Sequence, residues 1–324
     1  MKIARRKFLQ LTGAAGLLIL TRIGRAQAYP VRAVRIAVGF LAGSTTDIVA
    51  RLLAQWLQDR LGQPFIVENR PGAGGTLATE LAVGAPPDGY TLLMTNSALA
   101  INAALDHNQR FDIRRDIAPI GAIVAVPNVM VVNPSVSATT VPQFIAYAKA
   151  NPGKLNMGSA GTGSSGHLAG ELFKMMAGVD LVHVPYRGSP AALSDLLAGQ
   201  VQVYFAPMPP AIEHIRAGKL RALAVTTPTR WAALPQVPAV AEFVPGYEAD
   251  TWSGLAAPAN TSAGVIDVLN MELNAALADP KIKSTLADMG GLVLGGSPDD
   301  AAKLLSDEIE KWTKVVTHAG LKQQ

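Results

Sequence analysis

Short β-rich runs alternate with amphipathic helical patterns along most of the chain, and this alternation limits the choice of fold more than any other feature. In residues 47–57, for example, Ile48, Leu52 and Trp56 recur at the spacing of one helix face. Alternating strands and helices predict an α/β architecture built on mostly parallel sheets. The expected strands are residues 35–38, 65–68, 91–94, 129–132, 154–157, 181–184, 201–205, 220–225 and 254–257.

Two extended, proline-marked segments, residues 124–135 and 247–260, are predicted to carry the chain between two lobes. Lobe one then consists of residues 29–125 plus 254–324, and lobe two of residues 126–253, with a mostly parallel sheet in each. A simple division into an N-terminal and a C-terminal half is the alternative. The 296 residues that follow residue 28 are enough for two lobes of ordinary size.

The first 28 residues have the layout of a secretory signal, with a basic start, an apolar run over residues 11–20 and small residues at 26–28. The apolar run is too short to span a bilayer. The pair Arg5-Arg6 is typical of a twin-arginine signal, and a general secretory signal with a chance arginine pair is the alternative. We expect cleavage before Tyr29 and a periplasmic location.

The formal net charge of +4 belongs to this leader. Residues 1–28 contain six basic residues and no acidic one, so their removal leaves 22 basic against 24 acidic residues, a net charge near −2. Nothing in this charge balance suggests a nucleic-acid-binding face or a polybasic membrane patch. Cysteine is absent and the five histidines lack metal-ligand spacing, so we expect no disulfide, no thiol nucleophile and no metal site.

Residues 161–166 match the glycine pattern G-x-G-x-x-G, which can mark a dinucleotide site. Such a site needs an acidic residue at the C-terminal end of the following strand, where it binds the ribose. Here Asp180 precedes that strand, and Tyr186 and Arg187 follow it. NAD is also mainly a cytoplasmic cofactor, which an exported protein does not meet. We therefore expect no cofactor, and another use for the loop.

A glycine- and serine-rich loop before a helix occurs twice. Residues 43–53 align with residues 163–173 without a gap, so that Ser44 corresponds to Ser164 and Thr45 to Ser165. The free N–H groups and the dipole at a helix N-terminus form an anion site without a cationic side chain. If the lobes face each other, both sites point into one cleft, and a small molecule with two separated carboxylates bridges them. The alternative is that both segments are only well-capped βα turns.

Five segments together resemble one known family: residues 40–57, 62–93, 151–173, 184–201 and 217–227. They include the runs "FLAGSTTDIVARLLAQWL", "NPGKLNMGSAGTGSSGHLAGELF" and "VPYRGSPAALSDLLAGQV". The chain resembles the Bug/TctC-type receptors, the periplasmic solute-binding components of tripartite tricarboxylate transporters. The resemblance implies a two-lobed periplasmic-binding-protein fold of the Venus-flytrap kind (type II). It also implies closure on a carboxylated metabolite and delivery to large and small permease subunits.

The resemblance places the ligand against the loop after the first strand, against residues 159–164 and, more loosely, against residues 95–97. With Phe40, His167 and Arg187 added on their chemistry, the candidate ligand-binding residues are Phe40, Ala42, Gly43, Ser44, Thr45, Thr46, Ser97, Ser159, Gly161, Thr162, Gly163, Ser164, His167 and Arg187. His167 is equally explained by local packing, Arg187 by a surface turn, and Phe40 by the core.

The chain departs from the family pattern at Leu41 and Ala42, where two prolines are usual, and at Ser44, where glycine is usual. Ala206 stands where the family commonly has an aspartate, which favours a ligand without an amine.

We expect a monomeric receptor for a di- or tricarboxylate or an aromatic carboxylate, rather than an enzyme. A receptor that partners a sensor kinase uses the same binding chemistry and remains an alternative. A secreted hydrolase is disfavoured, because no G-x-S-x-G elbow is present and no aspartate is placed to orient His167 beside Ser164.

Overall fold

The structure is a computed structural model that describes residues 29–105, 110–232 and 234–319. The fold reported below is that of the unit that begins at Arg32. The predicted export signal lies outside the described residues, and the predicted cleavage before Tyr29 stays a prediction. No helix in the described part of the chain is long and apolar enough to cross a membrane.

One sheet of six strands has the order β11-β4-β10-β3-β1-β2. Its strands are β1 (Val34–Val38), β2 (Phe65–Asn69), β3 (Thr91–Asn96), β4 (Ile117–Val126), β10 (Thr251–Pro258) and β11 (Leu292–Gly295). β1 runs parallel to β2 and β3. β10 runs antiparallel to β3 and β4, and β11 runs antiparallel to β4.

A second sheet of five strands has the order β7-β6-β8-β5-β9. Its strands are β5 (Asn128–Val132), β6 (Asn156–Ser159), β7 (Val182–Pro185), β8 (Val203–Pro207) and β9 (Arg221–Val225). β6 runs parallel to β7 and β8. β5 runs antiparallel to β8 and β9.

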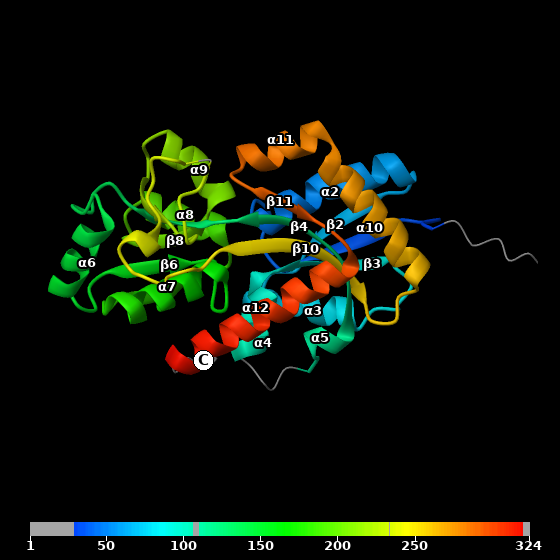
Figure 1. Cartoon of the computed structure of the whole chain (residues 1–324), viewed down its shortest axis with the longest axis horizontal. Coiled ribbons are helices and arrows are strands. Elements are labelled where there is room, and N and C mark those ends of the chain that lie inside the picture. Colours follow the sequence, from blue (N-terminus) through cyan, green and yellow to red (C-terminus); the bar gives the residue numbers. More distant parts are fainter. Residues whose placement is uncertain (1–28, 106–109, 233, 320–324) are drawn as a thin grey trace, which may run out of the picture. The chain divides into compact units, whose positions relative to one another are not determined.

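Both sheets are therefore mixed: most strands of each sheet run in one direction, as expected, and β10 and β11 in the first sheet and β5 in the second run against them. The cause is the way the chain passes from one sheet to the other. β5 follows β4 after the single residue Pro127, so it enters the second sheet where β6 and β8 end. β10 likewise enters the first sheet at the end where β3 finishes. Each entering strand must then run against its neighbours (Figure 1).

Helices pack on both sheets, and their ends mark the loops between strands. They are α2 (Thr45–Leu61), α3 (Thr76–Val83), α4 (Ser97–Leu105), α5 (Ile113–Asp116), α6 (Val141–Ala150), α7 (Ser165–Ala177), α8 (Ser189–Leu197), α9 (Met208–Arg216), α10 (Ala263–Ala278), α11 (Pro280–Asp288) and α12 (Pro298–Ala319). Two short 3₁₀ segments cover Ala73–Gly75 and Val240–Glu242.

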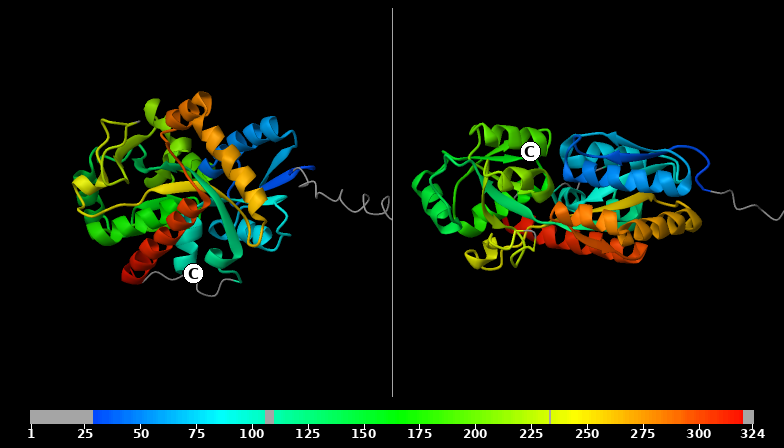
Figure 2. Two further views of the ribbon diagram at one scale, coloured as in Figure 1. Left: turned by 45° about the vertical axis from the view of Figure 1, so that its right-hand side comes forward. Right: turned by 90° about the horizontal axis from the view of Figure 1, so that it is seen from above.

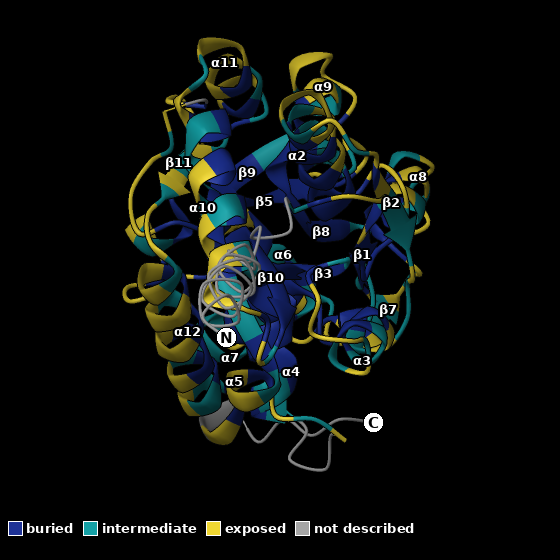
Figure 3. Cartoon of the chain, turned by 90° about the vertical axis from the view of Figure 1, so that its right-hand side faces the viewer, coloured by how far each residue is buried: buried dark blue, intermediate teal, exposed yellow. Residues whose placement is uncertain are grey.

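The long C-terminal helix α12 packs against β4 of the first sheet, against α4, and against α7, which itself packs on the second sheet (Figures 1 and 2). Its apolar residues Leu305, Ile309, Trp312 and Val316 are buried. The central strands are buried throughout, whereas the outer faces of α10, α11 and α12 are exposed (Figure 3). The core thus lies along the strands and under the helices.

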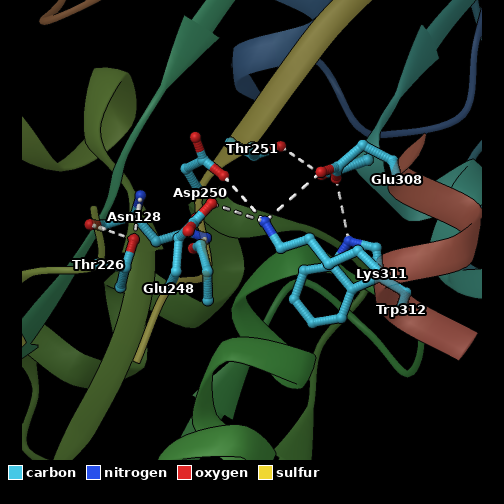
Figure 4. A network of polar contacts seen from close by, with 10 residues as sticks. Asn128, Thr226, Glu248, Asp250, Thr251, Glu308, Lys311 and Trp312 are labelled. Atoms are coloured by element: carbon cyan, nitrogen blue, oxygen red, sulfur yellow. Dashed lines mark hydrogen bonds and ion pairs between the residues drawn. The ribbon is translucent and has the colours of Figure 1, made fainter. Parts of the chain in front are cut away.

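The two passages between the sheets are tied together by polar contacts (Figure 4). At the first, the Asn128 side chain donates to Ala249 O of the second (3.0 Å), and the Thr226 hydroxyl bonds the Asn128 backbone (3.0 Å). At the second, Lys311 Nζ of α12 lies 3.1 Å from Glu248 Oε1 and 3.6 Å from Asp250 Oδ1.

Burial raises the pKa of Asp250. Burial lowers the pKa of Lys311, but Glu308, Asp250 and Glu248 together raise it overall. The ammonium group therefore stays charged and holds residues 248–250 against α12.

Candidate functional site

The N-terminus of α2 is organised by its own first turn. Ser44 is the N-cap, and its hydroxyl accepts from Asp47 N (3.3 Å). Gly43 has a φ of 80°, a left-handed conformation that favours glycine, and its N–H donates to Asp47 Oδ2 (2.9 Å). The loop before α2 is thereby folded back onto the first turn of the helix.

The N-terminus of α7 repeats this geometry. Ser164 is the N-cap, and its hydroxyl accepts from His167 N (3.4 Å). Gly163 has a φ of 77°, and its N–H donates to His167 Nδ1 (3.2 Å). A Cβ at Gly163 would also lie 2.1 Å from Asn102 Oδ1, so only glycine fits where this loop meets α4. The predicted correspondence of the two loops therefore extends to their hydrogen bonds.

Asp47 is ionised although it is buried. Burial alone would raise the pKa of Asp47, but hydrogen bonds from Arg51, from Gly43 N and from Asn69 outweigh this and lower it below its ordinary value. Arg51 Nη2 lies 2.9 Å from Asp47 Oδ1. The negative charge near this helix N-terminus is thus compensated locally.

His167 is neutral. Burial, with smaller contributions from His183 and Lys174, lowers the pKa of His167 to about 3. The two imidazoles stack with ring centroids 3.9 Å apart, and burial also lowers the pKa of His183 to about 4. His183 Nε2 lies 2.7 Å from Ser159 Oγ. An unprotonated Nδ1 on His167 agrees with its role as acceptor for Gly163 N–H.

The two helix N-termini border a small inner cavity of about 30 Å³. Hydroxyl groups dominate its wall: Ser44, Thr45, Thr46, Ser97, Ser164, Ser165, Ser189, Thr251 and Ser253 line it. Most of these hydroxyls are hydrogen-bonded within the protein, as Thr46 is with Asn96 (3.1 Å) and Ser97 with Thr251 (2.5 Å). Thr45 is 6% exposed, and its Oγ1 has no hydrogen-bond partner among the described residues.

A second, outer cavity of about 430 Å³ adjoins the first. The two share Phe40 and Ala160. Its remaining wall consists of Gly39, Pro71, Gly72, Ala73, Gly74, Gly161, Thr162, Tyr186 and Arg187. It is bounded by elements of both sheets, with Arg187 as its cationic side chain.

The candidate residues fall into four groups. Ser44, Thr45, Thr46, Ser97 and Ser164 line the inner cavity, Gly161, Thr162 and Arg187 line the outer one, and Phe40 lines both. Ala42, Gly43, Ser159, Gly163 and His167 line neither. Of these, Gly43, Gly163 and His167 shape the loops through the bonds described above. Ala206 is a buried residue of β8, and its neighbour Pro207 lines the inner cavity.

Several lining residues are not among the candidate ligand-binding residues, although the resemblance had placed the ligand loosely against residues 95–97, which include Asn96. Thr251 and Ser253 come from β10, which re-enters the first sheet beside β3, and Asn96 comes from the last position of β3. Pro71, Gly72 and Gly74 lie in the "RPGAGG" turn, which has a glycine-rich signal but reads equally well as an ordinary turn. Ser165 and Gly166 directly follow the candidate residue Ser164. Their position in the first turn of a predicted helix was the feature that could have identified them.

The arrangement lacks the geometry of a serine hydrolase at Ser164. Its hydroxyl accepts from a backbone N–H, and the His167 ring faces Gly163 rather than Ser164. The Ser159–His183 contact is partly buried, and neither residue lines a cavity described above. Among the described residues, no group of three or more histidine, cysteine, aspartate or glutamate side chains is placed to hold a metal ion.

Comparison with known proteins agrees with this geometry. The profile of the family described as "Tripartite tricarboxylate transporter family receptor" matches residues 49–321. Protein BugT of Bordetella pertussis is 37% identical over 92% of each chain.

Two solved structures are also similar. Rpa4515 of R. palustris with adipate superposes with a TM-score of 0.88 at 37% identity, covering 91% of this chain and 99% of that one. MatC of Rhodopseudomonas palustris with bound malate superposes with a TM-score of 0.85 at 31% identity, covering 89% and 100%.

The predicted periplasmic-binding-protein fold is confirmed by these structures, and so is the resemblance noted in the sequence. The family profile includes the loop before α7, and the two solved structures each cover about nine-tenths of the chain. The chain belongs to the family of tripartite tricarboxylate transporter receptors, a family of solute-binding proteins.

Proposed function

We propose that this protein is a periplasmic receptor that captures a small carboxylate between the N-termini of α2 and α7. The observation that carries the proposal is the pairing of two identically capped helix N-termini around one cavity, with the buried Thr45 hydroxyl left unpartnered. Relatives solved with adipate and with malate support a carboxylate as the ligand class. Delivery to the permease subunits of a tripartite tricarboxylate transporter is the role that family membership favours.

The inner cavity favours an anion although none of its lining residues is a lysine or an arginine. Free backbone N–H groups and the helix dipoles supply the positive potential. Charge-assisted hydrogen bonds contribute about 1.5–3 kcal/mol each, so a handful, less the ordering costs, gives dissociation constants in roughly the micromolar range. The carboxylate accepts hydrogen bonds from backbone N–H groups of the loops before α2 and α7. The hydroxyl groups of the inner cavity are further donors.

Closure is part of the proposal. The lobes are residues 29–125 plus 254–324 and residues 126–253, and they close because some contacts to the ligand exist only in the closed state. Contacts across the loops support this. Pro190 lies near Gly43, and Leu41 lies against Gly188, so the loop before α2 meets the start of α8.

The test is titration calorimetry on the purified protein, refolded to remove carried-over ligand. The panel contains mono-, di- and tricarboxylates and aromatic carboxylates, with NAD as a control. Micromolar binding of a carboxylate with NAD silent supports the proposal. Binding of NAD, or silence from every carboxylate, contradicts it.

A matched pair of variants locates the site. Thr45→Val removes the unpartnered hydroxyl while keeping the shape of the side chain, and it should weaken carboxylate binding about tenfold. Thr91→Val is the control, because Thr91 is also buried but lies at the start of β3, away from both cavities. Equal effects of the two substitutions on affinity would place the ligand elsewhere.

A further inference from the structure

One hydrogen bond joins the two proposed lobes without touching the ligand site. The Trp231 indole of lobe two donates from Nε1 to Gly290 O of lobe one (2.7 Å). Neither residue lines the inner or the outer cavity. The bond can therefore influence how the lobes are arranged, but it makes no contact with a ligand in either cavity.

The donor is held by lobe two. The Trp231 side chain packs against a buried cluster that includes Ile212 of α9 and Val225 of β9. In the same segment, the Arg230 guanidinium donates to both carboxylate oxygens of Glu242 (2.9 Å each). The indole is thus fixed to this lobe and moves with it.

The acceptor is held by lobe one. Gly290 follows α11 with a φ of 78°, and its N–H donates to Ala287 O (2.8 Å), while Gly291 N donates to Leu286 O (2.7 Å). This is the Schellman pattern that ends many helices. β11 begins two residues after Gly290 and pairs with β4. The carbonyl group is therefore fixed to the first sheet.

The bond lies beside the first passage between the sheets. Leu292 pairs with Ala125 just before Pro127, and Val225 pairs with Val129 just after it. α9 and α11 lie on the same side of the molecule (Figures 1 and 3), and α9 also contacts α2 of lobe one. Hydrogen bonds tolerate only a narrow range of distances and angles, so a relative shift of about 1 Å between the lobes breaks this one.

Loops of the two lobes are in contact in this structure. A Cβ added at Gly188 would lie 3.2 Å from Leu41 Cβ, and one added at Gly74 would lie 2.9 Å from Thr162 O. This is the closed arrangement, and it includes the indole hydrogen bond. We propose that the Trp231–Gly290 bond is a latch, which stabilises the closed arrangement and slows the release of a captured ligand. The inference rests on the proposed closure and adds to it a residue outside the ligand site that sets affinity.

A latch of this kind affects all ligands equally. Trp231 lines neither cavity, so its loss changes the fraction of closed protein and leaves the fit of each ligand unchanged. The apparent dissociation constant rises in proportion as that fraction falls. Loss of one hydrogen bond should weaken binding roughly threefold to tenfold, by the same factor for every carboxylate.

The experiment is titration calorimetry on Trp231→Phe with each carboxylate of the panel that the native protein binds. Phenylalanine keeps an aromatic ring in the cluster but has no N–H to donate. We expect the uniform weakening given above, and stopped-flow measurements should show faster dissociation. Trp56→Phe is the matched control, because Trp56 is also half-buried but its Nε1 has no hydrogen-bond partner among the described residues. It should keep the native affinities.

Tryptophan fluorescence is a second readout. Ligand binding should change the emission of the native protein and of Trp56→Phe, and the change should be smaller in Trp231→Phe. If Trp231→Phe does not fold, Trp231→Leu also fills the cluster without a donor. Native affinity in the folded Trp231 variant, or a factor that differs between carboxylates, overturns the inference alone. If the native protein binds no carboxylate of the panel, the proposed function is overturned and this inference with it.

Discussion

The loops before α2 and α7 reach the same geometry with opposite chemistry. In both, a glycine at a φ near 80° precedes a serine N-cap, and the side chain three residues after the serine accepts from the glycine N–H. That side chain is the ionised Asp47 in one loop and the neutral His167 in the other. The geometry therefore requires an acceptor at this position but not a charge.

The next helical turn repeats the contrast. Arg51 pairs with Asp47, whereas Glu171 stands at the corresponding position of α7, with its Oε1 3.9 Å from His167 Nε2. Glu171 is itself paired with Lys174 (2.9 Å). A formal negative charge sits in the first turn of α2 but not of α7. We infer that the N-terminus of α7 has the more favourable electrostatic potential for an anion. At the N-terminus of α2, Arg51 offsets the repulsion between Asp47 and a bound anion.

The largest expected effect comes from removing the charged member of the pair. Asp47→Ala leaves Gly43 N, Asn69 and Arg51 without their shared acceptor, and it should lower the free energy of unfolding by about 2–4 kcal/mol, since the exposed Arg51 is rehydrated but the other two donors are not. Urea denaturation measures this. His167→Ala removes a neutral acceptor and should cost about 1–2 kcal/mol. Equal losses would mean that the charge of Asp47 contributes nothing beyond its hydrogen bonds.

Most of this local chemistry could be predicted from the sequence, because it is contained within short segments. The gapless alignment of residues 43–53 with 163–173 depends on spacing alone, and cap, glycine and acceptor all lie within five positions. The nine expected strands all exist with small shifts in their ends. What could not be predicted depends on contacts between distant segments.

β4 and β11 show the limit. Residues 117–123 form most of β4, but Pro119 and Gly121 in that run are residues typical of turns and concealed the strand. β11 is a four-residue edge strand close to several glycines, too short to show alternation. Thr251 reaches the inner cavity only because β10 pairs with β3 and β4, a pairing fixed by the whole sheet.

The two loops should also differ in how the free energy of unfolding depends on pH. His167 has an ordinary pKa near 6.5 when unfolded and about 3 when folded. Between these values the unfolded chain binds a proton that the native state does not, so stability falls as the pH is lowered from about 6.5. His183, at about 4 when folded, adds a loss of the same sign.

His167→Gln keeps an acceptor but removes this titration. Between pH 6.5 and pH 4.5 the variant should lose about 2 kcal/mol less than the native protein. Asp47 does not contribute in this window, because its lowered pKa places its loss of stability at more acidic pH. Chemical denaturation at a series of pH values checks the difference. Parallel curves for variant and native protein would refute the neutral state assigned to His167.

Exchanging the acceptor chemistry tests the inference about anion affinity. His167→Asp should weaken carboxylate binding about tenfold, because it puts a negative charge at the N-terminus of α7 and beside Glu171. Adding Glu171→Arg reproduces the α2 arrangement of Asp47 with Arg51. The double variant should recover stability and part of the affinity, measured by denaturation and calorimetry. Full affinity in the single variant would show that the two helix ends tolerate charge equally.

The smallest expected effect concerns the residues that follow the two caps. Thr45 and Ser165 correspond in the alignment and both line the inner cavity. The Thr45 hydroxyl has no partner in the described chain, whereas Ser165 Oγ donates to Asn128 Oδ1 (3.4 Å). The Asn128 side chain in turn donates a hydrogen bond to Ala249 O. Ser165 therefore connects the α7 end of the cavity to both passages between the sheets, at Asn128 and at Ala249.

Ser165→Ala should therefore reduce carboxylate affinity only about twofold to threefold, less than Thr45→Val does, because its hydroxyl is already engaged. It should also lower the free energy of unfolding by about 1 kcal/mol, since Asn128 Oδ1 loses a donor in a buried position. Calorimetry and denaturation on the same preparation separate the two readouts. A loss of affinity equal to that of Thr45→Val would mean that ligand binding breaks the Ser165–Asn128 bond, and that the cavity communicates directly with the passages between the sheets.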